Sequence, residues 1–238
     1  MIEFVSETES TNANLAARIR AGDPVPEGYW LVTDRQSDGK GRQGREWLDG
    51  PGNFMGSTVV RLNGREPPPA SLALVAGLAV YETVLARLLR PSQLELKWPN
   101  DLMLAGAKLA GILLEREGEA VIAGIGVNLA RSPRVADRKT ASLGQFGPAP
   151  DRDAFAADLA AAFEQEVARW RSFGLEPLLA RWQAAAHPEG TVLSLHEAEG
   201  RQVSGTFAGL APDGALRLRL ADGTTQTIHA GEVSLEGS

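Results

Sequence analysis

The segment from Gln36 to Trp47 (Gln-Ser-Asp-Gly-Lys-Gly-Arg-Gln-Gly-Arg-Glu-Trp) alternates glycines with cations in a chain whose formal net charge is -6. Glycine lets a backbone approach a ligand closely and adopt positive φ, and the cations supply charge-assisted donors for phosphate or carboxylate. A local positive loop on an acidic chain favours an anionic small ligand over DNA, which calls for a broad basic face. Taken alone, the same composition is also typical of a solvated loop.

The loop contains Gly39-x-Gly41-x-x-Gly44, the letter pattern of a dinucleotide-binding turn. That turn needs a strand directly before it and a helix directly after it, because the helix N-terminus receives the pyrophosphate. Residues 49–53, Asp-Gly-Pro-Gly-Asn, cannot form such a helix. The pattern therefore does not predict a Rossmann fold or a nicotinamide dehydrogenase.

Two further groups of residues could take part in chemistry. Residues 97–101 (Lys-Trp-Pro-Asn-Asp) precede a strand-like stretch from Lys108 to Glu115, in which Gly111 indicates close approach of a backbone to another group. Lysines around an amide and a carboxylate can bind an anion and its Mg²⁺, although surface lysines around an Asn-Asp turn would give the same letters. Residues 124–128 (Gly-Ile-Gly-Val-Asn) place two glycines in a strand that ends on an amide.

Composition limits the classes of protein. The 238 residues suffice for one large and one small domain with a sizeable core. The absence of cysteine excludes a disulfide framework, a zinc-cysteine site and a thiol nucleophile. The three histidines have no metal-like spacing and are interpreted as ordinary core or surface residues. With a polar, acidic N-terminus and no apolar run long enough for a bilayer, the protein is expected to be cytoplasmic.

The elements that must position these groups follow from periodicity and turn signals. In the first half we expect a helix at 14–19, a strand at 29–33, a strand at 54–62 and an amphipathic helix at 70–89. Short strands joined by tight turns follow at 94–97, 101–104, 108–117 and 120–129. Successive hairpins predict an α+β fold with a mixed, mostly antiparallel sheet flanked by helices.

The last third divides into helices and a small β unit. We expect an irregular, mobile segment at 131–150 and helices at 151–172 and 177–186. Four short strands separated by glycine and Asp-Gly turns then predict a small barrel, at 191–196, 202–210, 215–220 and 224–229. The composition changes near residue 188, so we predict a boundary there, with a larger domain at 1–187 and a small barrel at 188–238.

Taken in chain order, these motifs resemble those of the biotin protein ligases. Residues 10–12 (Ser-Thr-Asn) are similar to the start of that family's catalytic domain, and 36–47 to its adenylate loop. Residues 97–101, 108–115 and 124–128 resemble its Lys-Trp-Pro-Asn-Asp, Lys-x-Ala-Gly-Ile-Leu-x-Glu and Gly-Ile-Gly-x-Asn motifs, and 231–235 the closing segment of its C-terminal barrel. The resemblance spans nearly the whole chain and implies a class II synthetase-like catalytic domain with an SH3-like barrel.

The resemblance implies ATP-dependent biotinylation of one lysine of a biotin carboxyl carrier protein, as in acetyl-CoA carboxylase, through biotinyl-5′-AMP. It assigns catalysis to Arg42 and Lys108. Biotin binding falls to Ser10, Thr11, Asn12, Gln36, Gly39, Lys40, Gly41, Arg42, Lys108, Gly111 and Ile112. Adenylate binding falls to Arg42, Arg45, Trp47, Asn100, Lys108 and Asn128, and Mg²⁺ to Asp101. The substrates would be biotin and ATP, with Mg²⁺, and the loop is expected to order on ligand binding.

The family usually has arginine where Lys40 stands, and lysine keeps the charge but lacks the planar fork. Nine residues precede Ser10, too few for a helix-turn-helix, so we expect a monofunctional ligase with no DNA partner and no membrane partner. An exposed edge strand would suit a carrier complex or a homodimer.

Two rival hypotheses are a lipoate or octanoate ligase and a non-catalytic binding module. Residues 188–238 contain one aromatic residue, Phe207, which argues against a module that binds nucleic acid by stacking on its bases.

Overall fold

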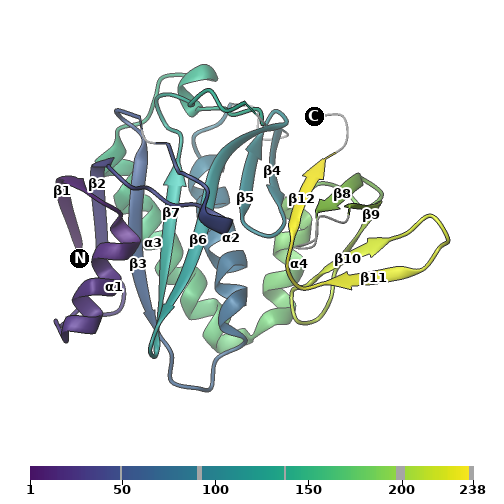
Figure 1. Cartoon of the computed structure of the whole chain (residues 1–238), viewed down its shortest axis with the longest axis horizontal. Helices are drawn as coiled ribbons and strands as arrows, with labels where there is room; N and C mark the ends of the chain where they lie inside the picture. The colour runs from purple at the N-terminus through teal and green to yellow at the C-terminus, as the bar shows by residue number, and fades with distance from the viewer. Residues whose placement is uncertain (49, 90–92, 137, 197–201, 236–238) are drawn as a thin grey trace.

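The computed structural model describes residues 1–48, 50–89, 93–136, 138–196 and 202–235. Two β-sheets organise this part of the chain, one of seven strands and one of five (Figure 1). The larger sheet has the order β1-β2-β3-β7-β6-β5-β4, in which β1 and β2 run parallel and the other neighbours antiparallel. The predicted α+β class, with a mixed, mostly antiparallel sheet flanked by helices, is confirmed.

The strands of the large sheet are β1 (Ile2–Thr8), β2 (Trp30–Gln36), β3 (Phe54–Arg61), β4 (Leu94–Lys97), β5 (Asp101–Leu104), β6 (Ala107–Glu117) and β7 (Ala120–Val127). The helices are α1 (Thr11–Ala21), α2 (Leu72–Leu85), α3 (Arg152–Phe173) and α4 (Leu175–Ala185). Sequence reasoning missed β1, whose acidic and hydroxyl side chains do not alternate cleanly with apolar ones. As an edge strand it needs only one paired side, so a weak pattern suffices.

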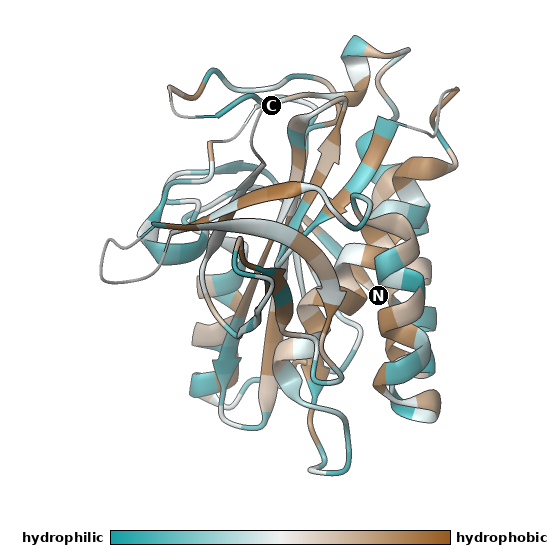
Figure 2. Ribbon diagram, turned by 90° about the vertical axis from the view of Figure 1, so that its right-hand side faces the viewer, coloured by the Kyte–Doolittle hydropathy of each residue, from teal (hydrophilic) through white to brown (hydrophobic). Residues whose placement is uncertain are grey.

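Alternate residues of the strands enter two separate cores. Trp30 and Val32 of β2 pack with α2 and α3, whereas Leu31 between them packs with Leu15 of α1. Because successive side chains of a strand point to opposite faces, α1 covers one face of the sheet and α2 with its neighbours covers the other (Figure 1). In Figure 2 the helices carry both hydrophobic and hydrophilic residues, as helices with one covered side do. The α1 face is also the face that bears the candidate site.

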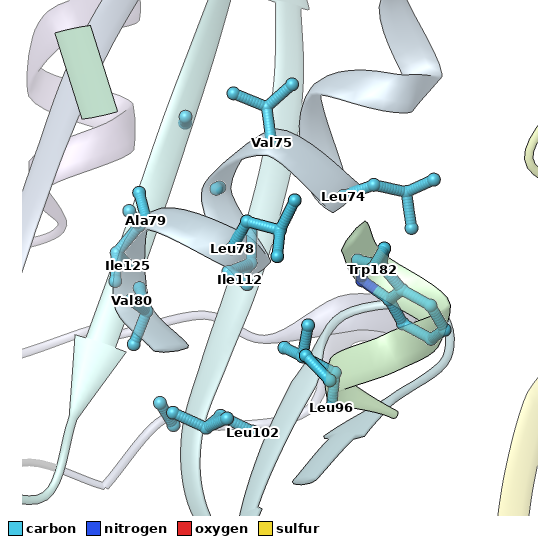
Figure 3. Packing of buried hydrophobic residues seen from close by; sticks show 14 of the residues in the cluster. Leu74, Val75, Leu78, Ala79, Val80, Leu96, Leu102, Ile112, Ile125 and Trp182 are labelled. Atoms are coloured by element: carbon cyan, nitrogen blue, oxygen red, sulfur yellow. The ribbon is translucent and has the colours of Figure 1, made fainter. Parts of the chain in front are cut away.

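Helix α2 is shorter and more buried than the sequence predicts. The α-helix covers Leu72–Leu85 rather than 70–89, after a 3-10 turn at Pro69–Ser71. Its buried residues surround most of the axis, because the helix lies between the sheet and the pair α3 and α4. In the view of Figure 3, Leu78 lies above Ile112 and Leu74 lies above Trp182, and all four belong to one buried cluster. A Cβ on Gly77 would lie 3.3 Å from Leu96, so the glycine lets helix and sheet approach closely.

The C-terminal region forms the five-stranded antiparallel sheet, in the order β11-β10-β9-β8-β12. Its strands are β8 (Val192–His196), β9 (Gln202–Leu210), β10 (Leu216–Arg219), β11 (Thr225–Ile228) and β12 (Glu232–Leu235). Leu96 of β4 forms a β-bridge with Ala186, and the buried ring of the next residue, His187, lies 4.5 Å from Phe207 of β9, so residues 186 and 187 link the two sheets. The domain boundary at 187 and 188 remains a prediction. In the described ranges no helix is long and apolar enough to cross a membrane.

Candidate active site

A row of residues across five neighbouring strands forms the floor of a cavity on the α1 face. The strand register places Met55 opposite Gly126, Gly126 opposite Gly111, and Gly111 opposite Asp101, which in turn pairs with Lys97. Residues directly opposite each other on neighbouring strands share a face, and all five line the cavity. The cavity encloses about 870 Å³, including its solvent-open mouth. Motifs separated by more than seventy residues thus meet in one line.

Two glycines of this floor hold the indole of Trp47. A Cβ on Gly126 would lie 2.3 Å from the indole, and a Cβ on Gly111 would lie 3.1 Å from the indole and from Lys108 Nζ. No side chain fits at position 126 while the ring is there, since real Cβ contacts are not so short. The Nζ atom of Lys108 lies 5.8 Å from the centroid of the same ring, within cation–π range. The glycines therefore create a flat slot that accepts a ring system.

The first turn of α1 supplies a buried polar cluster at one end of the cavity. Ser10 caps the helix, and Thr11 and Asn12 are buried directly behind it. Ser57 Oγ lies 2.6 Å from both Thr11 Oγ1 and Asn12 Oδ1, and Gln36 Oε1 accepts from the Thr11 N–H at 2.8 Å. These hydroxyls and amides offer both donors and acceptors. Sequence reasoning included Ser10, Thr11, Asn12 and Gln36 but missed Ser57, which sits in an apolar-looking strand.

Glu115 completes this cluster on the strand β6. Its Oε2 accepts from Asn12 Nδ2 at 2.7 Å, and a Cβ on Gly124 would lie 2.4 Å from Asn12 Oδ1. The Asn12 amide thus lies between the Glu115 carboxylate and the backbone of Gly124 on β7. These contacts fix the orientation of the Asn12 amide.

Asp101 holds two lysines at the centre of the floor. Its Oδ1 lies 2.6 Å from Lys108 Nζ, and its Oδ2 lies 3.3 Å from Lys97 Nζ. Burial by itself raises the pKa of the Asp101 carboxyl, but the charges and hydrogen bonds of Lys108 and Lys97 outweigh burial and hold that pKa below its usual value. The carboxylate is therefore ionised at neutral pH, and it directs two ammonium groups along the cavity wall.

The glycine-cation loop folds over this floor as a small hairpin. Trp47 N donates to Gly39 O at 2.8 Å, and Gly41 N donates to Arg45 O at 2.7 Å. The backbones of Lys40 and Glu46 form an antiparallel β-bridge. The hairpin turns through Gln43 and Gly44, which have φ of 58° and 73°. Gln43 is one of two non-glycine residues with positive φ in the described ranges, a backbone conformation that favours glycine and asparagine.

Arg42 joins the loop to the Lys-Trp-Pro-Asn-Asp motif. Its Nη1 donates to Asn100 Oδ1 at 3.2 Å, and Asn100 Nδ2 donates to Ile112 O at 2.7 Å. Arg45 and Lys40 also line the cavity. Three motifs, the loop, residues 97–101 and the β6 strand, are therefore connected by side-chain hydrogen bonds as well as by shared walls.

The C-terminal sheet also reaches the site. Lys97 Nζ donates to Val233 O of β12 at 3.0 Å, and Trp98 Nε1 donates to Gly214 O at 3.1 Å. Val233 itself lines the cavity. No local pattern indicates these contacts, because the partners are separated by more than a hundred residues and pair through backbone oxygens. The cavity wall depends on both sheets.

Two predicted site residues lie outside the cavity lining. Gly39 is buried, and a Cβ there would lie 2.7 Å from Trp47 O, so its place is inside the hairpin. Asn128 is 2% exposed; its Nδ2 donates to Ala141 O at 3.0 Å, and its Oδ1 faces Asn53 Nδ2 at 3.5 Å. Its amide therefore fastens the end of β7 to Ala141. The other predicted residues line the cavity. Further lining residues within the motifs were not predicted to take part: Gln43, Glu46, Trp98, Pro99, Leu113, Ile125 and Val233. Met55, Gly56 and Arg138 line the cavity from outside every motif.

The donor set does not fit a Mg²⁺ ion held by the protein. Within the described ranges no group of three or more His, Cys, Asp or Glu side chains could hold a metal. The Asp101 carboxylate, the predicted ligand, already contacts two ammonium groups. Bringing a dication into that site would place three positive centres around one carboxylate. The Mg²⁺ assignment to Asp101 therefore has no support from its geometry.

The fold is a mostly antiparallel seven-stranded sheet with a polar cavity on one face, joined to a β-rich C-terminal unit. Residues 4–130 match the Biotin/lipoate A/B protein ligase family, and residues 195–236 match the Biotin protein ligase C terminal domain. The chain belongs to the Biotin/lipoate A/B protein ligase family.

Within this family, the chain is similar to individual enzymes that are named as biotin ligases. The chain is 36% identical to the biotin--[acetyl-CoA-carboxylase] ligase of Paracoccus denitrificans over 98% of this chain and 100% of that protein. It is 33% identical to the enzyme of the same name from Mycobacterium tuberculosis over 98% of this chain and 88% of that one. Among solved structures, a biotin protein ligase from Aquifex aeolicus in complex with biotin and ATP superposes with a TM-score of 0.85 at 25% identity, covering 100% of this chain and 99% of that one.

Proposed function

We propose that this protein is a biotin–[acetyl-CoA-carboxylase] ligase, which forms biotinyl-5′-AMP from biotin and ATP and transfers the biotinyl group to a lysine of a biotin carboxyl carrier protein. The main supporting observation is the convergence of Arg42, Asn100 and Lys108 with the α1 polar cluster on one cavity. The names of relatives that match 98% of the chain agree with it.

The first step joins the biotin carboxylate to the α-phosphorus of ATP and releases pyrophosphate. Both reactants are anions, so positioning and charge neutralisation supply most of the catalysis. Lys108 and Arg42 provide the positive charges, and Asp101 keeps the Lys108 ammonium directed along the floor. We assign the ureido ring of biotin to Thr11, Asn12 and Gln36, whose donors and acceptors are already oriented.

In the second step the carrier's lysine amine attacks the acyl carbon, the bond to the phosphate oxygen breaks, and AMP leaves with that oxygen. The loop at 36–47 covers the mixed anhydride and limits its hydrolysis, because water is kept from the acyl carbon. Asp101 already binds two lysines. Any Mg²⁺ that the reaction needs would therefore be bound by the phosphates of the nucleotide, which offer the oxygen ligands that Mg²⁺ prefers.

Biotin-dependent exchange of labelled pyrophosphate into ATP tests the first step, and biotin transfer to an isolated carrier domain tests the second. We expect both with biotin and neither with lipoate or octanoate. Lys108→Ala should reduce exchange by at least about a hundredfold, because a charge aimed at the reacting anion is lost. Lys139→Ala, which removes an exposed amine outside the cavity lining, is the matched control. Exchange that responds to lipoate instead of biotin would overturn the proposal.

A further inference from the structure

The primary amines of this chain are few and concentrated. Of 24 lysines and arginines only four are lysines, and all four fall within the described residues: Lys40, Lys97, Lys108 and Lys139. Three of them line the cavity, and Lys139 directly follows the cavity-lining Arg138. The fifth primary amine is the α-amine of Met1. This distribution matters because an acyl phosphate reacts with free primary amines, whereas a guanidinium stays protonated.

The lysines that line the cavity differ in their freedom. The side chains of Lys97 and Lys108 are 14% and 16% exposed, and Asp101 binds both. The Lys40 side chain is 53% exposed and forms an ion pair with Asp38, itself 64% exposed, at 3.0 Å. Such a surface pair costs little to open. Lys40 therefore combines a position on the cavity wall with an amine that can move.

The α-amine of Met1 is far from the cavity. Strand β1 is parallel to β2, and its Thr8 end pairs with the cavity-lining Gln36, while its Ile2 end pairs with Trp30. Six residues of extended chain separate the two ends by about 20 Å. Met1 is 80% exposed, so its amine is open to any acylating agent that has left the site.

We propose that Lys40 is a self-acylation site, at which the enzyme's own biotinyl adenylate biotinylates the loop when no carrier is bound. This proposal rests on the proposed function, because it needs the mixed anhydride. The Nζ atom of Lys40 attacks the acyl carbon, an amide bond forms, the acyl–phosphate bond breaks, and AMP departs while the amine releases a proton. The product is one biotinyl group on the glycine-cation loop.

Three properties of the reaction follow from this assignment. The hydrogen bond and charge of Asp38 raise the pKa of the Lys40 amine, so the fraction of free amine, and with it the labelling rate, should increase about tenfold per pH unit below that pKa. A carrier domain competes for the same adenylate, so its addition should suppress the labelling of Lys40. Labelling within the site should also be independent of protein concentration.

The test is incubation of the full chain with biotin and ATP but no carrier, followed by peptide mapping of every primary amine. We expect label at Lys40 to exceed label at Met1 and Lys139 by more than about tenfold, since an amine in the cavity gains the advantage of proximity. Adenylate formation is measured in the same reaction by pyrophosphate release. If no adenylate forms, the proposed function fails; if adenylate forms and Lys40 remains unlabelled, the self-acylation proposal fails.

Lys40→Arg is the matched variant, because it keeps the cation and removes the nucleophile. Per adenylate formed, it should lose the label at position 40 with no gain at the other amines. Lys139→Arg should keep the label at Lys40. Equal labelling of Lys40, Lys139 and the Met1 amine would mean that released adenylate acts in solution, and it would refute a reaction inside the site.

Discussion

The change Asp101→Asn tests how the cavity floor is held together. It keeps the shape and some hydrogen bonding of the side chain but leaves Lys97 and Lys108 side by side without their counter-charge. Removing one partner of a buried ion pair costs about 3–5 kcal/mol, and Asp101 is 13% exposed with partners at 2.6 and 3.3 Å. We therefore expect a loss of about 3 kcal/mol in the free energy of unfolding at pH 7, together with a decrease in pyrophosphate exchange.

Urea unfolding at several pH values measures this loss. The pKa of Asp101 is lower in the folded chain than its unfolded value of 3.8, so on acidification the unfolded chain binds the proton first. The stabilisation is thus complete above the unfolded pKa and is lost as the pH falls through the folded one. The difference between the parent and Asp101→Asn should be constant from pH 7 to about 5 and should shrink below about 4.

The matched control is Asp34→Asn, because Asp34 is 62% exposed and forms its ion pair with Arg152 at the surface. Exposed pairs contribute about 0–1 kcal/mol. If Asp101→Asn costs no more than this control, or if its cost does not change with pH, the carboxylate does not hold the two lysines as described.

Three further predictions concern the loop and the contact between the sheets. Lys40→Arg should keep biotin transfer to the carrier within about tenfold of the parent, since one or two charge-assisted bonds change geometry; complete loss of turnover would contradict the role given to Lys40. Arg42→Gly removes the bond to Asn100 and should release free adenylate that labels bystander proteins, as read by streptavidin blot; adenylate retained as tightly as in the parent would show that Arg42 is not the latch. Burial against Phe207 lowers the pKa of His187 from 6.5 to about 4, so the unfolded chain binds the proton first as pH falls. About 3 kcal/mol of stability present above pH 6.5 should be lost by about pH 4, and His187→Leu should lack this part of the pH dependence in urea unfolding.

Local sequence signals predicted most of the elements well. Asp151 caps α3 by accepting from the N–H groups of Asp153 and Ala154, and the strands expected at 94–97 and 101–104 have those bounds in the structure. These features depend on neighbouring residues, so a single sequence contains them. The bounds of α2 were wrong because its ends are set by packing, and β1 was missed because pairing with β2 alone decides it.

The site residues also divide into those that local motifs indicate and those that only the fold brings to the cavity. Contiguous motifs predicted the chemistry of three segments: the glycine-cation loop, residues 97–101 and the strand that contains Lys108. The residue types and spacing within each segment indicate what it can bind. Asn128 is an exception: it belongs to a motif, yet its amide fastens β7 to Ala141, and neither residue lines the cavity. Conversely, Ser57 sits in an apolar-looking strand and contacts both Thr11 and Asn12.

The sequence by itself determined which side chains are available: the glycines that leave room, the cations that neutralise an anion, and the small number of lysines. The tertiary structure alone decided which of them face one another. Strand register aligned Met55, Gly126, Gly111, Asp101 and Lys97 in one row, and the packing of the second sheet brought Val233 to Lys97. The physical reason is that register and sheet packing depend on the burial of many distant residues at once, which no local pattern encodes.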